Sequence, residues 1–257
     1  MATLLLKKSY LHKNLKEIKF HDLWNFYGAF TTMRVIGRPA KILFFDEHIN
    51  NLLNSLKIYN IKNKNQKKNI LKLISIHLKK NKNYDHLLRI AINKKIISIS
   101  LRKRVKIDKK FKLKLINYQR VDPKHKNLKY KKIIRLLNSL DTSKFDIALH
   151  KNNKILETGT SNLLFFKGKK AFSPNLNIYK GTTLKFFAKK LKKIFYKKIY
   201  LDSLDNYDEI LLIGSGKAVT SVESIENTTW KRKSLENYRL LNNIYQKAVK
   251  NCPRYKS

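Results

Sequence analysis

The chain has 257 residues, which is enough for one large domain or two small ones, and we expect two lobes. Its 58 Lys and Arg against 17 Asp and Glu give a formal charge of +41, which favours anionic ligands. The lysines are scattered rather than gathered in one block, and Lys, Asn and Ile all have A/T-rich codons, so genome composition is the simplest explanation of the charge. The single cysteine, Cys252, excludes an internal disulfide and a thiolate metal cluster, and no metal site is expected.

The first part of the chain predicts a smaller mixed α+β lobe, placed at residues 1–118. A turn at residues 37–39 separates two apolar runs, and residues 93–95 separate two more, which is typical of hairpins. Apolar residues at helical spacing predict two helices, the first with Asp46 as its N-cap. The strands expected here are residues 24–35, 42–45, 86–92, 96–101 and 111–118, and the helices are residues 49–56 and 70–78.

Residues 119–125 contain Asp122 and Pro123 without apolar periodicity, so we expect an interdomain connection there. A larger α+β lobe follows over residues 126–257. Its expected helices are residues 130–137, 182 to about 198 and about 235–250, and its expected strands are residues 146–149, 209–213 and the two runs that flank residues 157–162.

The apolar run at residues 1–6 is too short for a secretory signal and no stretch is long enough for a membrane span, so a cytoplasmic protein without membrane contact is expected.

Residues 154–166 predict a strand, a turn and a second strand, with Glu157 at the bend. A buried carboxylate needs a cationic or hydrogen-bonding partner, although the segment alone would favour an ordinary polar hairpin turn. The run from Glu157 through Asn162 to Phe165 resembles the E-x-x-x-S-N-x-F segment of the fold-type IV pyridoxal-phosphate enzymes. That family contains the branched-chain and D-amino-acid aminotransferases and 4-amino-4-deoxychorismate lyase. The resemblance implies a two-lobed α+β fold, pyridoxal 5′-phosphate as cofactor, and Glu157 facing the pyridine nitrogen.

Two earlier segments are similar to the same family. Residues 30–35, Phe-Thr-Thr-Met-Arg-Val, followed by His48, resemble its opening motif. Residues 125–130, His-Lys-Asn-Leu-Lys-Tyr, resemble its lysine motif, which implies that Lys126 carries the Schiff base with the cofactor. Lys124 and Lys129 remain open alternatives for this role.

Two later segments resemble the phosphate-binding loops of the family. Gly181, Thr182 and Thr183 precede an expected helix, whose first N–H groups suit a phosphate, and Ser215 lies in a glycine-containing turn after an apolar strand. The resemblance implies that these four residues hold the cofactor phosphate. Two arginines of the family pattern are replaced here, by Asn51 and Leu184.

The resemblance implies an aminotransferase that acts on an amino acid and 2-oxo acid pair, of the branched-chain or D-amino-acid type. Elimination of pyruvate from aminodeoxychorismate, the lyase reaction, is the first alternative, because the cofactor-binding residues are common to both reactions. A basic nucleic-acid-binding protein is the second, although no recognised binding module accompanies the charge. A homodimer is implied by the resemblance. The residues expected to contact substrate are Arg34, Arg89 and Tyr130, with Arg102 as a further carboxylate-binding candidate.

Overall fold

The computed structural model describes residues 4–79 and 81–255, and the chain divides into two compact units. Unit 1 comprises Met1–Arg104, His125–Lys131 and Asn251–Ser257, and unit 2 comprises Val105–Lys124 and Lys132–Lys250. Each unit is built from segments that are distant in the sequence. The expected lobes, 1–118 and 126–257 with a connection at 119–125, are continuous by contrast, and their boundaries stay a prediction.

Unit 1 contains an antiparallel six-stranded sheet with the order β2-β1-β6-β5-β3-β4. Its strands are β1 (Leu4–Leu11), β2 (Glu17–Ile18), β3 (Gly28–Gly37), β4 (Lys41–Ile42), β5 (Tyr84–Asn93) and β6 (Ile96–Lys103). The expected hairpin around residues 93–95 is present as β5 and β6, which pair from Ile92 and Ile97 outward. β1 was not expected, because Lys7 and Lys8 interrupt its apolar run, yet it pairs with β6 along most of its length.

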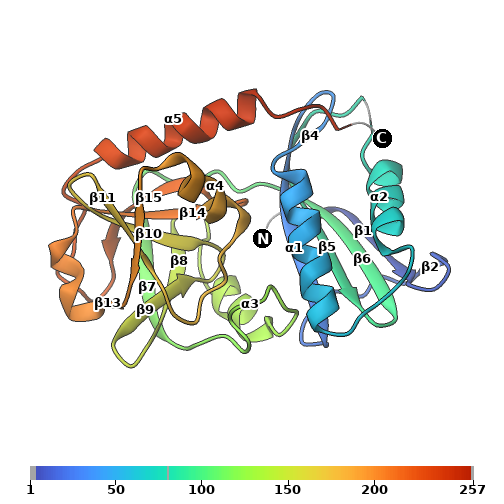
Figure 1. Ribbon diagram of the computed structural model, residues 1–257, viewed down its shortest axis with the longest axis horizontal. Helices are drawn as coiled ribbons and strands as arrows, with labels where there is room; N and C mark the ends of the chain where they lie inside the picture. Colours follow the sequence, from blue (N-terminus) through green and yellow to red (C-terminus); the bar gives the residue numbers. More distant parts are fainter. Residues whose placement is uncertain (1–3, 80, 256–257) are drawn as a thin grey trace. The chain divides into compact units, whose positions relative to one another are not determined.

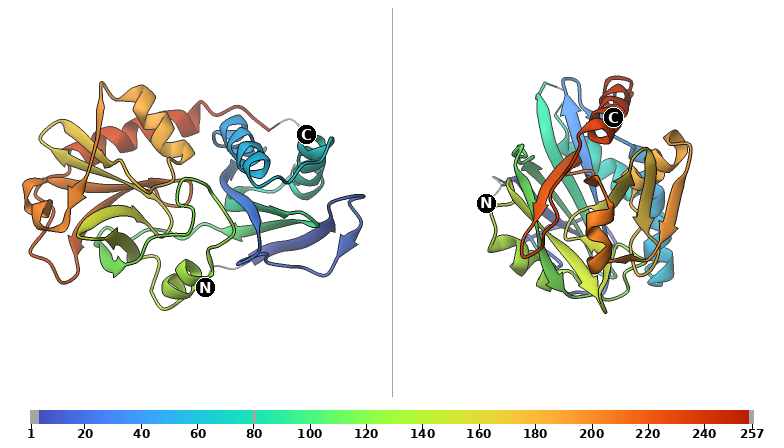
Figure 2. Two further views of the ribbon diagram at one scale, coloured as in Figure 1. Left: turned by 60° about the horizontal axis from the view of Figure 1, so that its bottom comes forward. Right: turned by 90° about the vertical axis from the view of Figure 1, so that its left-hand side faces the viewer.

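Two helices, α1 (Phe45–Ile58) and α2 (Gln66–His77), cover one face of this sheet (Figure 2). Ile49 and Ile70 from the helices and Met33 and Leu88 from the sheet are buried together in one hydrophobic core. The expected N-cap Asp46 is wrong: α1 begins at Phe45, and Asp46 lies in its first turn. A carboxylate still stabilises the helix there, because the first turn carries the positive end of the helix dipole.

Unit 2 contains a mixed nine-stranded sheet with the order β12-β11-β10-β14-β15-β7-β8-β9-β13. Its strands are β7 (Phe111–Asn117), β8 (Phe145–Lys151), β9 (Lys154–Thr158), β10 (Asn162–Lys167), β11 (Lys170–Pro174), β12 (Ile194–Lys197), β13 (Ile199–Tyr200), β14 (Glu209–Gly214) and β15 (Ala218–Ile225). The strands on either side of the Glu157 turn are present as β9 and β10, but they do not form a simple hairpin. β9 pairs with β8 and β13, whereas β10 pairs with β11 and β14. The turn therefore carries the chain from one region of the sheet to another.

The helices of the second part of the chain are α3 (Lys131–Asn138), α4 (Thr182–Lys190), the 3₁₀ helix η1 (Leu201–Asn206) and α5 (Glu236–Lys250). Both α4 and α5 pack against β14 (Figure 1). The expected extension of α4 to about residue 198 is wrong, because Leu191 leaves the helix with extended dihedral angles and residues 194–197 form β12. Apolar residues at helical spacing continue to Phe195, so the sequence pattern does not indicate where the helix ends. The aromatic pair Phe195 and Tyr196 nevertheless favours a strand.

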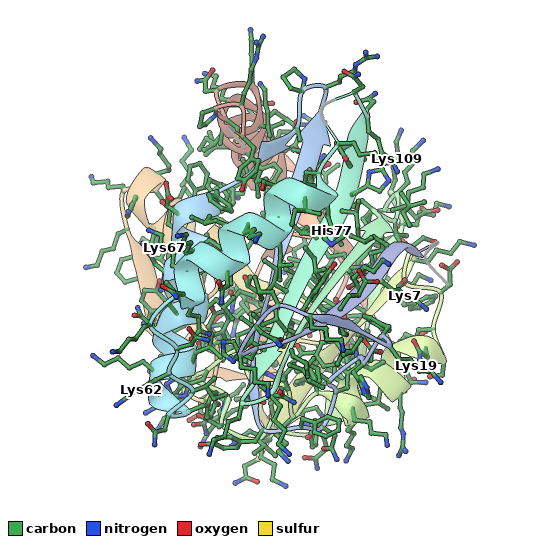
Figure 3. All side chains as sticks on the ribbon, turned by 90° about the vertical axis from the view of Figure 1, so that its right-hand side faces the viewer. Lys7, Lys19, Lys62, Lys67, His77 and Lys109 are labelled. Carbon is green, nitrogen blue, oxygen red and sulfur yellow. The ribbon has the colours of Figure 1, made fainter. Side chains whose placement is uncertain are left out.

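The positive charge is spread over the surface of the units. Lys7, Lys19, Lys62 and Lys67 of unit 1 are all exposed and project at separate places (Figure 3). Among residues 4–79 and 81–255, none of the helices combines the length and apolar character needed to cross a membrane.

Candidate active site

Lys126 lies in an extended segment of unit 1 that is bound to the first residues of β3. The amide of Phe30 donates to the carbonyl of Lys126 (3.0 Å), and the amide of Leu128 donates to the carbonyl of Gly28 (3.0 Å). Ala29 and Asn127 form an isolated antiparallel bridge between these contacts. Lys126 precedes the expected helix, which is present as α3 and begins at residue 131. A backbone held by strand-like hydrogen bonds fixes the direction of its side chain more firmly than an irregular loop would.

Of the three lysines considered for the Schiff base, Lys126 has the most enclosed surroundings. Lys124 and Lys129 are exposed, whereas Lys126 is half-buried. The Nζ atom of Lys126 lies 4.8 Å from the centre of the Phe30 ring, and Nζ of Lys129 donates to the carbonyl of Asn25 (3.0 Å). Partial desolvation favours the neutral amine that a nucleophile requires. The surroundings therefore favour Lys126, and its catalytic role stays a prediction.

His48 is buried in unit 1 near this lysine. Its Nδ1 atom lies 2.9 Å from Oγ1 of Thr31, on the strand that also carries Phe30. Burial, with a smaller contribution from the charge of Lys126, lowers the pKa of His48 from 6.5 to about 3. The imidazole is therefore neutral at physiological pH and adds no positive charge beside Lys126.

The depressed pKa of His48 predicts a specific sensitivity to acid. Because the folded state binds the proton more weakly than the unfolded state, the stability from this residue is lost as the pH falls below 6.5. Between pH 7 and pH 5 the free energy of unfolding of the wild type should fall by about 2 kcal/mol more than that of His48→Asn. Urea denaturation of both proteins at the two pH values measures this difference. Parallel losses would show that His48 does not titrate differently in the two states.

The residues expected to contact substrate have partners within unit 1. Arg34 forms an ion pair with Asp85 (3.3 Å), and Arg89 forms one with Asp22. The guanidinium of Arg89 also lies 4.3 Å from the ring centre of Trp24. A carboxylate clamp built from either arginine would have to exchange or share these partners, so both assignments stay predictions.

Tyr130 belongs to an aromatic group in unit 1 that also contains Phe30 and Trp24. Its ring centre lies 5.5 Å from that of Phe30 and 5.9 Å from that of Trp24. Leu23 and Leu128 are buried beside these rings. This group presents an apolar environment next to Lys126, which suits a hydrophobic ligand better than a charged one.

In unit 2, Glu157 is part of a buried salt bridge. Its Oε1 atom accepts a hydrogen bond from Nε of Arg120 (2.7 Å), and both side chains are almost fully enclosed. Arg120 also donates through Nη2 to the carbonyl of Pro123 (2.9 Å). The other carboxylate oxygen, Oε2, accepts a hydrogen bond from the amide of Tyr179 (3.3 Å). The carboxylate is therefore held in one orientation with a cation beside it.

Tyr179 places a phenol in the same surroundings. Burial, opposed by the charge of Arg120 and supported by that of Glu157, raises the pKa of Tyr179 to about 12. The hydroxyl thus keeps its proton throughout the physiological pH range. It can donate a hydrogen bond to an anionic oxygen but cannot act as a base there.

Asn162, the first residue of β10, joins the Glu157 turn to the start of α4. Its Nδ2 atom donates to the carbonyl of Tyr179 (2.6 Å), and its Oδ1 atom accepts from the amide of Gly181 (3.0 Å). A Cβ atom at Gly181 would lie 2.9 Å from Oδ1 of Asn162, so a larger residue cannot fit without displacing the amide.

The first turn of α4 has the properties of an anion site. Gly181 is its N-cap without a side-chain cap hydrogen bond, and the first turn contains no acidic residue. Thr182 and Thr183 are buried at this end. The first N–H groups of a helix have no intrahelical acceptor and favour a phosphate.

Ser215 lies in the turn between β14 and β15, close in the fold to these residues. β14 pairs with β10, where Ile213 is opposite Asn162. A Cβ atom at Gly214 would lie 2.8 Å from Oγ of Ser161, so the Ser215 turn packs directly against the Glu157 turn. The structure therefore gathers Glu157, the start of α4 and the Ser215 turn around residues 161–162 of unit 2.

Sequence reasoning missed two residues of this group, Arg120 and Tyr179. Arg120 lies within the expected interdomain connection at residues 119–125, and Tyr179 immediately precedes the Lys180-Gly181-Thr182-Thr183 segment. The need of a buried carboxylate for a cation predicts some partner for Glu157. Among 58 basic residues, however, the sequence offers no means of choosing which one.

Solved structures of other proteins share this architecture. The chain is similar to the branched-chain aminotransferase of Thermoproteus uzoniensis in its complex with norvaline, with a TM-score of 0.77, 17% identity and 95% of each chain covered. It is also similar to the Escherichia coli branched-chain amino acid aminotransferase, with a TM-score of 0.74, 15% identity and 93% of each chain covered. A pyridoxal-phosphate-bound hypothetical aminotransferase from Mycobacterium tuberculosis matches with a TM-score of 0.70, 12% identity and coverage of 95% of this chain and 99% of that one. A search of curated proteins finds no match.

The solved structures define the fold as that of the fold-type IV aminotransferases, which confirms the expected two-lobed α+β architecture. The family model for amino-transferase class IV matches residues 28–225, and the chain belongs to that family. The family resemblance and the expected class of enzyme, an aminotransferase, are thereby confirmed, and neither the lyase nor the nucleic-acid-binding alternative is favoured.

Proposed function

We propose that this protein is a pyridoxal-phosphate-dependent aminotransferase that transfers the amino group between a branched-chain amino acid and a 2-oxo acid. The observation that carries the proposal is the grouping around residues 161–162 of unit 2. There a buried carboxylate, Glu157, the start of α4 and the Ser215 turn are joined through direct contacts of residues 161–162 and 179. Family membership supplies the class of reaction, and this grouping provides donors and acceptors that suit the cofactor.

The residues fit pyridoxal phosphate on two grounds. The phosphate suits the first turn of α4, where Gly181, Thr182 and Thr183 offer N–H groups and hydroxyls, together with the hydroxyl of Ser215. The pyridine nitrogen suits Glu157, whose carboxylate is oriented by Arg120. When bound, the cofactor withdraws the electron pair released at the substrate α-carbon. Similar structures include complexes with a phosphopyridoxyl-glutamate and with pyridoxamine phosphate, which supports this choice of cofactor.

In this proposal Lys126 would hold the cofactor covalently in the resting enzyme, would be released when the substrate amine takes its place, and would then move a proton. Its amine takes the proton from the substrate α-carbon, which requires the neutral form. The half-buried position of Lys126 favours that form, because desolvation disfavours the charged amine. Glu157 keeps a negative charge at the pyridine nitrogen, which stabilises the protonated ring.

An aliphatic substrate side chain is supported by the aromatic group of Phe30, Tyr130 and Trp24 in unit 1. The similar structures named as branched-chain aminotransferases point to the same class. Arg34 and Arg89 are proposed as carboxylate contacts, although each already pairs with an aspartate. We further propose a cytoplasmic homodimer, for which sedimentation velocity of the purified protein gives the direct test of assembly.

The test is a half-reaction. Purified protein saturated with pyridoxal phosphate is mixed separately with L-leucine, L-valine, D-alanine and aminodeoxychorismate, and the visible absorbance of the cofactor is followed. We expect L-leucine and L-valine to convert the cofactor to its amine form and to yield the matching 2-oxo acids. Conversion with D-alanine alone would change the substrate class. Release of pyruvate and 4-aminobenzoate from aminodeoxychorismate, without conversion by any amino acid, would replace the proposal with the lyase.

A further inference from the structure

Asp146, on β8 of unit 2, is a fully buried carboxylate that the proposed reaction does not use. Its Oδ1 atom accepts a hydrogen bond from the amide of Ile147 (2.8 Å). Its Oδ2 atom accepts one from the hydroxyl of Thr160 (2.6 Å), and the hydroxyl of Thr158 lies 3.2 Å away. Burial raises the pKa of Asp146, while the charge of Lys217 and these donors oppose the rise.

The donors Thr158 and Thr160 belong to the turn that directly follows Glu157. Oγ1 of Thr158 accepts from the amide of Ser161 (2.8 Å), and its proton is shared between Asp146 and the carbonyl of Ser161 (3.1 Å). At Gly159 a Cβ atom would lie 3.0 Å from Oδ1 of Asp146 and 2.8 Å from Ile147. Thr158, Gly159 and Thr160, the first three residues of the turn, therefore all lie against the Asp146 carboxylate.

The remaining compensating charge comes from Lys217, which follows Ser215 in the turn between β14 and β15. Lys217 is buried, with its Nζ atom 4.5 Å from the ring centre of Phe111 and donating to the carbonyl of Thr142 (2.5 Å). Its charge interacts with Asp146. The turn after Glu157 therefore donates hydrogen bonds to this buried carboxylate, and the Ser215 turn carries a buried cation whose charge stabilises it.

We propose that Asp146 is a positioning residue that fixes the Glu157 turn and the Ser215 turn relative to each other. A buried carboxylate costs free energy unless donors and an opposite charge compensate it, and here these come mostly from the two turns. Gly214 and Ser161 bring the turns into direct contact, so movement of either one is transmitted to the other. The inference rests on the proposed function, since it assigns both turns to cofactor binding.

Thr160 allows a sharp test, because the residue is exposed while its hydroxyl reaches buried Asp146. The variant Thr160→Val removes that hydrogen bond at nearly constant volume, and Thr160→Ser keeps it. The dissociation constant of pyridoxal phosphate, measured by absorbance titration of the apoenzyme, should rise about tenfold in T160V, the order expected for one hydrogen bond to a charged group. T160S should stay close to the wild type. Asp146→Asn should weaken binding at least as much, and T160V should add little to it.

Glu209 provides the matched control, because it is equally buried in unit 2 but accepts hydrogen bonds from Asn237 and Tyr238 at the start of α5. Glu209→Gln should speed amide hydrogen exchange at the start of α5 and leave the cofactor dissociation constant unchanged. D146N should instead speed exchange in residues 158–161 and 214–218 of the apoenzyme. Absence of cofactor binding by the wild type would overturn the proposed function. Tight wild-type binding that T160V and D146N leave unchanged would overturn the positioning role alone.

Discussion

Replacing Lys126 by alanine is expected to abolish covalent attachment of pyridoxal phosphate and to lower kcat/KM by about 10⁴-fold, the upper end of what a positioned acid–base group contributes. The amine of Lys126 is the half-buried one of the three neighbouring lysines, beside the ring of Phe30. Alanine removes both the group that binds the cofactor and the group proposed to move the proton. Borohydride reduction followed by peptide mapping should find the pyridoxyl group on the peptide that contains Lys126.

Lys124→Ala is the matched control, since it removes a lysine from the same short segment whose side chain is exposed. It should keep the covalent cofactor and change kcat/KM by less than about twofold, as an exposed surface substitution does. A pyridoxyl group found on Lys124, with kcat/KM retained in K126A, would transfer the role to that residue.

The features predicted from sequence are those whose physical causes are local. The Glu157 turn is a strand end, a threonine and glycine turn and a new strand, so its elements lie within a few residues of each other. The start of α4 after Gly181 is likewise defined by neighbouring residues. The predicted C-terminal end of α4 was wrong, because apolar residues at helical spacing continue into β12. The pairing of β12 with β11 makes that segment a strand.

Contacts between distant segments could not be predicted in this way. The hydrogen bond between Phe30 and Lys126 holds residues 125–131 against β3, in unit 1. No local sequence pattern indicates that this segment pairs with a strand so distant in the sequence. The choice of Arg120 as the partner of Glu157 depends in the same way on how β9 and the segment after β7 meet. Apolar and turn patterns predict which elements form, whereas the pairing of buried charges depends on the assembled fold.

The buried pair of Arg120 and Glu157 predicts opposite behaviour for stability and activity. Arg120→Met leaves the carboxylate of Glu157 buried without its cation, so the free energy of unfolding of the apoenzyme should fall by about 3–5 kcal/mol. The double variant Arg120→Met with Glu157→Gln removes both charges, and replacing a buried pair by neutral groups is often close to neutral. It should therefore recover most of the stability lost in R120M, as measured by urea denaturation.

Activity should not recover with stability. Glu157→Gln alone removes the charge proposed to face the pyridine nitrogen, so kcat/KM should fall by about 10²–10³-fold, a loss of the size seen for one preorganised electrostatic group. The double variant should show at least the same loss although it folds well. This separation distinguishes a carboxylate needed for the reaction from one that only completes a salt bridge. A stable double variant with wild-type kcat/KM would remove Glu157 from the proposed site. A double variant as unstable as R120M would show that the charge pair does not provide the stability. The hydrogen bond from Arg120 to the Pro123 carbonyl would then be its source.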